Sequence, residues 1–154
     1  MNQLSDFYHN WVGSRLIEPI VLNEPVPIED IYTPALVIDL DVFEANLMHM
    51  QQHLDQTGIL LRPHTKMHKC PIIARQQIEN GAQGICAAKL GEAEEKCGAG
   101  ITDVLITSLL ASMDKLQRFI ELRIKHAEVK LVVDNPDMVT VLDRMDDSSN
   151  VCIL

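Results

Sequence analysis

The residues best suited to chemistry lie in one short stretch of the chain, LLRPHTKMHK, which runs from Leu60 to Lys69. Half of its side chains are basic or imidazole groups: Arg62, His64, Lys66, His68 and Lys69. A lysine becomes a nucleophile for carbonyl carbons when apolar surroundings and neighbouring cations disfavour its charged form. We expect both conditions at Lys66, which is therefore a candidate for Schiff-base formation. Arg62, His64 and His68 could hold the anionic groups of a cofactor or substrate.

The spacing of these residues leaves two other interpretations of the stretch open. The first is a solvated basic loop, because lysine and arginine side chains are usually exposed. The second is a metal site, in which His64 and His68, with Cys70 close behind, would serve a metal-dependent hydrolase. A further pair, His49 and His53, lies four residues apart in a predicted helix. The apolar stripe of that helix runs along the opposite face, which indicates that this pair is solvated.

The composition excludes several classes of protein. The 154 residues carry a net charge of −9, from 13 basic and 22 acidic side chains, whereas nucleic-acid-binding proteins normally present a basic face. The N-terminal sequence MNQLSDFYHN has no secretory signal, and no apolar run approaches the ~18 residues of a membrane span. The four cysteines form no C-x-x-C pair. We therefore expect a cytoplasmic protein with reduced thiols that binds neither membranes nor nucleic acid.

Strand-like and helix-like segments alternate from Pro34 onward. The predicted strands cover residues 35–38, 59–62, 84–87, 103–107, 129–133 and 150–154. The predicted helices cover residues 39–56, 71–79 and 90–97, a segment that Ser112 caps, and a segment that begins at Asn135-Pro136 and ends at Met145. The run from Glu92 to Lys96 is most simply an exposed helix face with local ion pairing. This alternation indicates β-α-β units and a parallel sheet.

The short loops between these segments favour a β/α barrel over an open doubly wound sheet. A complete barrel needs about eight strand–helix units and ~250 residues, so we expect this chain to be the N-terminal part of a larger protein. Residues 1–32 contain three of the seven prolines and form a predicted extended arm, either for docking or as a loosely attached terminus. Residues 33–154 are the predicted β/α domain.

Four segments of the chain together resemble a known enzyme family. They are TPALVIDLDVFEANL, LLRPHTKMHK, GAQGICAAKLGEAEEKCGAGITDVLIT and VVDNPDMVTVLD. Their order is similar to that in the N-terminal part of the alanine racemase-like, fold-type III enzymes that use pyridoxal phosphate (PLP). The resemblance covers roughly Thr33 to Leu154. The motif RPH-x-K-x-HK points to the branch that contains D-threonine aldolase and D-serine dehydratase.

The resemblance implies a fold and a cofactor site. The fold is a partial TIM-type (β/α) barrel, in which this chain supplies about five of the eight strands from Ile59 onward, while residues 35–38 join a C-terminal β domain. The first lysine of the motif, Lys66, would carry PLP as a Schiff base, with Arg62 and His64 as supporting groups around the cofactor. Met67 stands where family members commonly have threonine, so a hydroxyl group near the cofactor is missing.

The resemblance also implies a lyase or isomerase of D-amino acids: an aldolase, a dehydratase or a racemase. In the aldolase and the dehydratase a divalent metal polarises the β-hydroxyl group. The family takes the ligands of that metal from its C-terminal region, so no metal site is predicted in this chain, and a homodimer would form through the same missing region. We expect the isolated chain to be poorly active; the alternative is a non-catalytic, truncated PLP-binding module.

Overall fold

The computed structural model describes residues 24–145 of the chain. Contacts divide the chain into two units, residues 1–38 and 39–154. In the first unit, the described residues form one short 3-10 helix, η1 (Ile28–Asp30), and otherwise irregular backbone. Residues 35–38, which were predicted to be a strand, are exposed and form no strand with the other residues of the range 24–145. Their predicted pairing with a C-terminal β domain stays a prediction. The predicted boundary between residues 32 and 33 stays a prediction.

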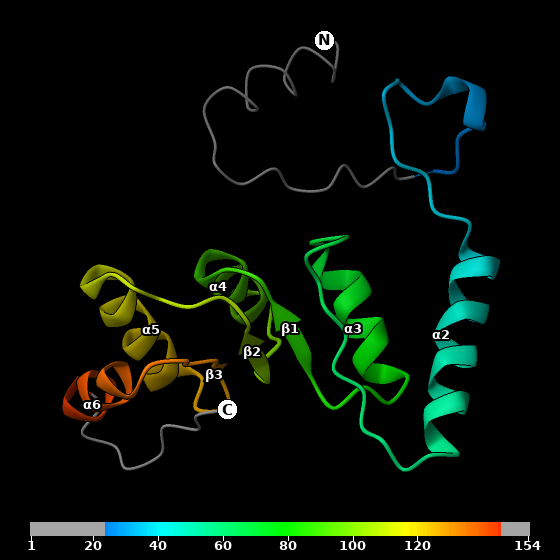
Figure 1. Cartoon of the computed structure of the whole chain (residues 1–154). Helices are drawn as coiled ribbons and strands as arrows, with labels where there is room; N and C mark the ends of the chain where they lie inside the picture. The colour runs from blue at the N-terminus through cyan, green and yellow to red at the C-terminus, as the bar shows by residue number, and fades with distance from the viewer. Residues whose placement is uncertain (1–23, 146–154) are drawn as a thin grey trace, which may run out of the picture. The chain divides into compact units, whose positions relative to one another are not determined.

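The second unit alternates helices with parallel strands. Its elements are, in chain order, α2 (Leu40–Asp55), α3 (Pro71–Glu79), β1 (Ile85–Ala87), α4 (Leu90–Gly98), β2 (Val104–Ile106), α5 (Met113–Lys125), β3 (Lys130–Leu131) and α6 (Pro136–Met145) (Figure 1). The strands pair in the order β1-β2-β3 and are parallel, with Ile85 opposite Val104 and Leu105 opposite Lys130. The predicted α/β alternation is confirmed for the described residues. The strand predicted at 150–154 lies outside them.

The backbone of residues 61–65 runs alongside β1 in the parallel direction. The N–H of Cys86 donates to Pro63 O at 2.8 Å, and the N–H of Thr65 donates to Cys86 O at 2.9 Å. His64 is the residue that forms an isolated bridge with Cys86. The strand predicted at 59–62 is wrong, since the pairing lies further along the chain. Pro63 has no N–H to donate, which keeps this ladder short.

Helix boundaries follow local signals in the sequence. Asp39 precedes α2, and its Oδ1 accepts the N–H of Val42 at 3.0 Å, as an N-cap does. Pro71 opens α3, where its missing N–H is harmless. Asn135 precedes α6, and its Oδ1 accepts a backbone N–H of the first turn at 2.8 Å. Ser112 occupies the N-cap position of α5 as predicted, but its side chain makes no capping hydrogen bond.

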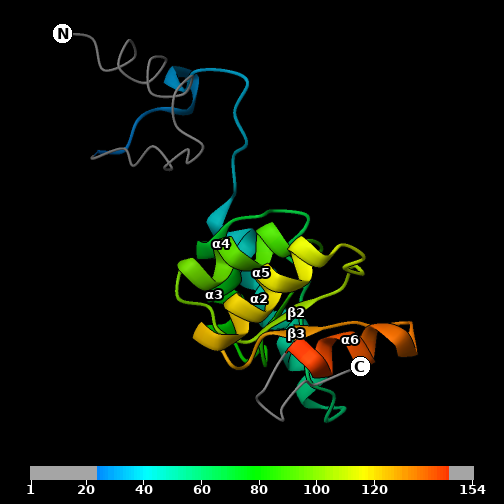
Figure 2. The ribbon, with the colours of Figure 1, turned by 90° about the vertical axis from the view of Figure 1, so that its left-hand side faces the viewer.

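One face of the sheet is buried under helices. Helix α4 packs on β1, β2 and α5, and α5 packs on α6 (Figure 2). The side chains of this layer are almost completely buried: Ile85, Ala87, Ala93, Val104, Ile106, Leu116, Phe119, Ile120 and Leu131. Three of them confirm the inner face predicted for α5. Their burial stabilises the unit by about 25 cal/mol for each Å² of apolar surface removed from water.

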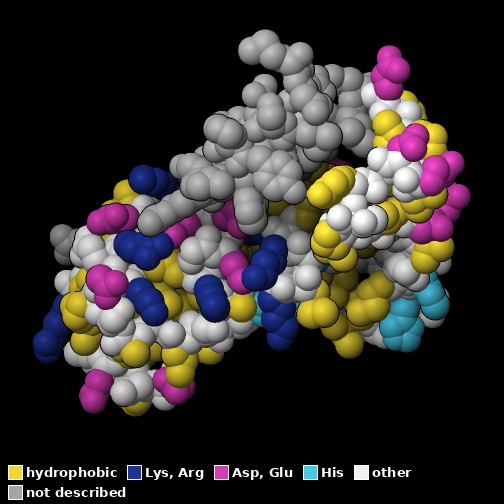
Figure 3. All heavy atoms as spheres, turned by 90° about the horizontal axis from the view of Figure 1, so that it is seen from above, with side chains coloured by type: hydrophobic (Ala, Val, Ile, Leu, Met, Phe, Trp, Pro, Cys, Tyr) yellow, Lys and Arg dark blue, Asp and Glu magenta, His cyan; other side chains and the backbone are white. Residues whose placement is uncertain are grey.

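The opposite face of the sheet is not covered by residues 24–145. Cys86, Leu105 and Lys130 lie next to one another on it, one from each strand, and all three are only half-buried. Parallel sheets are normally covered on both faces. Helix α2 buries no side chain either, and it exposes apolar residues such as Val42 and Met50. Figure 3 shows hydrophobic side chains between the charged ones on one face of the molecule. No helix in the described range has both the length and the apolar character needed to cross a membrane.

Three charged side chains form a network at the amino end of this uncovered face. Asp103, which precedes β2, accepts two hydrogen bonds from the Arg62 guanidinium at 2.9 Å each and one from Lys130 Nζ at 2.7 Å. Burial raises the pKa of Asp103, but the hydrogen bonds and charges of Arg62 and Lys130 outweigh burial and hold this pKa below its ordinary value. A Cβ at Gly84 would collide with the Arg62 guanidinium and would lie 2.6 Å from the backbone oxygen of Asp103, so the network needs glycine there.

We predict that Asp103→Asn lowers the free energy of unfolding by about 2 kcal/mol at neutral pH, because two cations lose their carboxylate. The folded pKa of Asp103 lies below its unfolded value. Its stabilisation is therefore present above about pH 4 and is lost as the pH falls through the folded pKa. Urea unfolding of both proteins from neutral to acidic pH measures this. Asp143→Asn, at an exposed position, is the control and should change stability by less than about 0.5 kcal/mol. Equal stabilities of Asp103→Asn and the parent at neutral pH would contradict the prediction.

Candidate active site

Lys66 lies directly beyond the carboxyl end of the segment that pairs with β1. The preceding residue, Thr65, is 1% exposed, and its Oγ1 donates to Cys86 O at 3.0 Å. The turn that follows closes where the N–H of Lys69 donates to Thr65 O at 2.7 Å. Lys66 and Met67 form the exposed tip of this turn. The predicted burial of Lys66 is therefore wrong, and its amine is open to solvent at the edge where β/α folds place their chemistry.

His64 holds the backbone of Lys66 through a chain of hydrogen bonds. Its Nδ1 accepts the N–H of Lys66 at 3.3 Å, and its Nε2 lies 3.2 Å from Thr107 Oγ1. The hydroxyl of Thr107 in turn donates to Ala87 O at 3.2 Å. Because Nδ1 accepts and the Thr107 proton is already used, we assign the imidazole proton of His64 to Nε2, from which it donates to Thr107. The carboxyl ends of β1 and β2 are thereby connected to the lysine.

The surroundings of His64 favour its neutral form. Burial lowers the pKa of the imidazole, and the positive charge of Lys66 lowers it further. The charge of Glu92 opposes both effects without cancelling them. Glu92 belongs to the first turn of α4, where its Oε2 accepts the N–H of Ala88 at 2.9 Å and its Oε1 lies 3.9 Å from Lys69 Nζ. A neutral imidazole is the form that can accept a hydrogen bond from the Lys66 backbone.

Arg62 lies on the same face as His64 but at the other end of the strands. Its guanidinium binds both oxygens of Asp103 and also lies 3.3 Å from the backbone oxygen of that residue. Arg62 therefore braces the amino end of the sheet. Its predicted role beside a cofactor stays a prediction, whereas His64 does contact the backbone of the candidate lysine.

The arrangement of His68 does not favour a metal site. Its Nδ1 accepts the N–H of Cys70 at 3.1 Å, and its buried Nε2 has no hydrogen-bond partner among the described residues. Burial lowers the pKa of His68, and the nearby charge of Lys96 lowers it further. Within residues 24–145 no three His, Cys, Asp or Glu side chains are grouped so that they could hold a metal ion. His49 and His53 are exposed on α2, which confirms the solvated face predicted for them.

Two important residues of this region were not predicted. Thr107 is the first residue after β2, so the rule that chemistry follows the carboxyl ends of strands could have found it. Lys96 was predicted to lie on an exposed helix face, which is wrong, because its side chain is completely buried together with those of Ala93 and Cys97. Positions three and four residues apart in a helix share a face, so the spacing of Ala93, Lys96 and Cys97 was the available signal.

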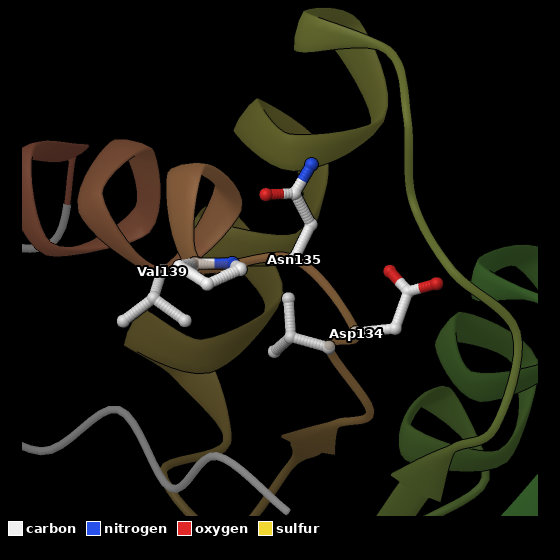
Figure 4. Close-up of a pocket in the computed structure, with 5 residues that line it drawn as sticks. Asp134, Asn135 and Val139 are labelled. Carbon is white, nitrogen blue, oxygen red and sulfur yellow. The ribbon is translucent and has the colours of Figure 1, made fainter.

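A shallow hollow lies at the carboxyl end of β3, where α6 begins. Val133, Asp134, Asn135, Pro136 and Val139 line it (Figure 4). The hollow is on the same edge of the sheet as Lys66, but it lies two strands away from β1, and neither Lys66 nor His64 lines it. Asn135 already caps α6 through its side chain. The hollow is thus separate from the turn that carries Lys66.

We predict that nitrogen NMR will find the His64 proton on Nε2 and a pKa below the ordinary 6.5. Because the folded pKa is lowered, the stabilisation from neutral His64 is present above about pH 6.5 and is lost as the pH falls through the folded value. Thr107→Val removes the acceptor, so it should mix the two tautomers and cost about 1 kcal/mol of stability. Thr102→Val, at an exposed position, is the matched control. Unchanged His64 spectra in Thr107→Val would contradict this assignment.

Comparison with known proteins identifies the family. The family model described as "Alanine racemase, N-terminal domain" matches residues 38–153. A D-threonine aldolase from Arthrobacter sp. is 40% identical over 128 residues, which make up 80% of this chain and 34% of the relative. A D-threo-3-hydroxyaspartate dehydratase from Delftia sp. (strain HT23) is 42% identical over 103 residues, which make up 67% of this chain and 27% of the relative.

The similarity extends to solved structures. The crystal structure of D-threonine aldolase from Filomicrobium marinum superimposes with a TM-score of 0.78 at 37% sequence identity, covering 82% of this chain and 35% of that chain. This chain therefore spans about a third of the length of these aldolases. The partial parallel sheet with its helices matches the first part of a TIM-type barrel, as predicted. The chain belongs to the family of the alanine racemase N-terminal domain.

Proposed function

We propose that PLP attaches to Lys66, and that the protein is a PLP-dependent lyase of D-amino acids that carry a hydroxyl group on Cβ. The observation that carries this proposal is the position of Lys66, an exposed amine at the tip of a turn directly beyond the carboxyl end of a paired segment. The names of two relatives support the substrate class, since D-threonine and D-threo-3-hydroxyaspartate are both β-hydroxy D-amino acids.

The residues around Lys66 fit an aldehyde cofactor with a negative charge. The amine of Lys66 is exposed and can reach a carbonyl carbon. Lys69, in the same turn, adds an exposed cation that suits an anionic phosphate group. His64 is neutral and holds the backbone N–H of Lys66, so it would orient the lysine without competing for its proton. Lys66 would thus hold the cofactor, and His64 would keep the backbone of Lys66 in place.

When bound, PLP supplies an electron sink that assists the breaking of a bond to Cα of an amino acid. The role of this chain is to keep the Lys66 amine accessible to the cofactor in a fixed position. Thr107 and His64 hold the backbone of Lys66 in place. The Cα of Lys66 therefore stays in position, and its amine moves only when the side chain rotates. Such fixed placement of a nucleophile is worth a large share of the barrier in reactions of this kind.

The proposal covers an aldolase and a dehydratase alike, because both need the same attachment of PLP to lysine. We extend it to a divalent metal in the whole protein and to a homodimer, both of which the family resemblance implies. We extend it also to the cytoplasm, where free cysteines such as Cys86 and Cys97 would stay reduced. A non-catalytic PLP-binding module is the second candidate, and it would share the attachment to Lys66 but show no turnover of a β-hydroxy D-amino acid.

We predict that borohydride reduction of the purified chain with PLP leaves one phosphopyridoxyl group, on Lys66, at a level about tenfold above any other lysine. Peptide mass mapping identifies the labelled residue. Lys66→Ala should lose the label. Lys115→Ala, which removes an exposed lysine of α5, should keep it and is the control. Labelling spread evenly over surface lysines, or a label that moves to Lys69, would contradict the proposal.

A further inference from the structure

We propose that Lys96 is a positioning residue that fixes the turn carrying Lys66; the consequence for PLP rests on the function proposed above. Lys96 lies in α4, 30 residues along the chain from Lys66, yet its side chain is 0% exposed. It is the largest completely buried side chain of the described residues. A charged lysine in such a place is unusual and needs a specific partner.

The partner of Lys96 is the backbone of the turn itself. Its Nζ donates a short hydrogen bond to Lys69 O and lies 3.4 Å from Glu95 Oε1. Glu95 is half-exposed, so the carbonyl of Lys69 is the acceptor inside the protein. The charge of Lys96 is also felt at His68, whose pKa it lowers after the larger effect of burial. The ammonium group therefore lies under the far end of the turn.

The turn is held at two points with Lys66 between them. At its first end, Thr65 is bound to β1 through its N–H and its hydroxyl. At its second end, Lys69 has φ 55°, a left-handed conformation that costs a non-glycine residue about 1 kcal/mol. A hydrogen bond from a buried cation to the carbonyl of Lys69 can hold that conformation in place. Thr65 and Lys96 together fix the position of the Lys66 backbone relative to the sheet and the direction in which its side chain points.

A role in overall stability alone does not explain a buried ammonium. Replacing a buried charge by an apolar side chain of similar volume is often neutral or stabilising. Lys96→Met keeps the length and the apolar packing but removes the donor. A positioning role predicts a loose turn in a protein that melts at the same temperature or higher, whereas a purely structural role predicts a lower melting temperature with the turn unchanged.

The first experiment compares amide exchange in the parent chain, Lys96→Met and the control Lys115→Met, at an exposed lysine of α5. The reporter is the N–H of Lys69, which is bonded to Thr65 O, and the N–H of Cys86 in β1 reports on the sheet. In Lys96→Met we expect exchange at Lys69 to be about tenfold faster, with exchange at Cys86 unchanged. This readout needs no PLP.

The second experiment measures the phosphopyridoxyl label on Lys66 in the same three proteins. We expect Lys96→Met to reduce the yield by about tenfold, since a small displacement of a nucleophile is costly, while Lys115→Met keeps the parent yield. Unchanged exchange at Lys69 in Lys96→Met overturns the inference whatever the label does. Faster exchange with an undiminished label on Lys66 overturns it as well.

The two proposals fail in distinguishable ways. If the parent chain takes no label on Lys66 but Lys96→Met still speeds exchange at Lys69, the proposed function is overturned and the anchoring of the turn is supported. If Lys96→Met does not fold, as judged by circular dichroism, Lys96→Gln repeats the test with a polar end that is too short to reach Lys69 O. If neither variant folds, the ammonium is needed for α4 itself, and the positioning role is overturned.

Discussion

The parallel pairing between residues 61–65 and β1 is the interaction on which the rest of this region depends. Cys86 is its centre, since its N–H donates to Pro63 O and its carbonyl accepts both the N–H and the hydroxyl of Thr65. Successive side chains of an extended segment point to opposite faces. This register places His64 on the uncovered face and buries Thr65. A slip by one residue would exchange the two faces and bury Lys66 in place of Thr65.

The same pairing resolves how an acidic protein accommodates so many bases in one stretch. Arg62 is neutralised by Asp103 at the amino end of the sheet, and Lys69 lies near Glu92 at the carboxyl end. His64 is kept neutral mainly by its burial. What looks in the sequence like one cluster of positive charge is thus spread over two ends of the sheet, each with its own carboxylate. Lys66 remains as the cation at the exposed tip.

Local signals explain what the sequence could predict. Helix α3 was predicted with its observed bounds, 71–79, because proline and glycine mark its two ends. The position of Lys66 after a paired segment also followed from local pattern, although that segment lies further along the chain than predicted. Non-local contacts explain the rest. The burial of Lys96 depends on a carbonyl 27 residues earlier, and the brace of Arg62 depends on a carboxylate 41 residues later. The sequence predicted an exposed Lys96 and a ligand-binding or solvated Arg62, since the partners of both side chains become neighbours only in the folded chain.

Met67 stands beside Lys66 at the tip of the turn and is 85% exposed. The turn is held by backbone groups of Thr65 and Lys69, and none of these hydrogen bonds uses the side chain at position 67. Substitutions at exposed positions away from such contacts usually change stability by less than about 0.5 kcal/mol. Position 67 is thus free to vary while remaining adjacent to Lys66, the proposed nucleophile. If PLP attaches to Lys66 as proposed, position 67 is a natural first site for a saturation library in laboratory evolution, since substitutions there would change the surroundings of the cofactor without disturbing the fold.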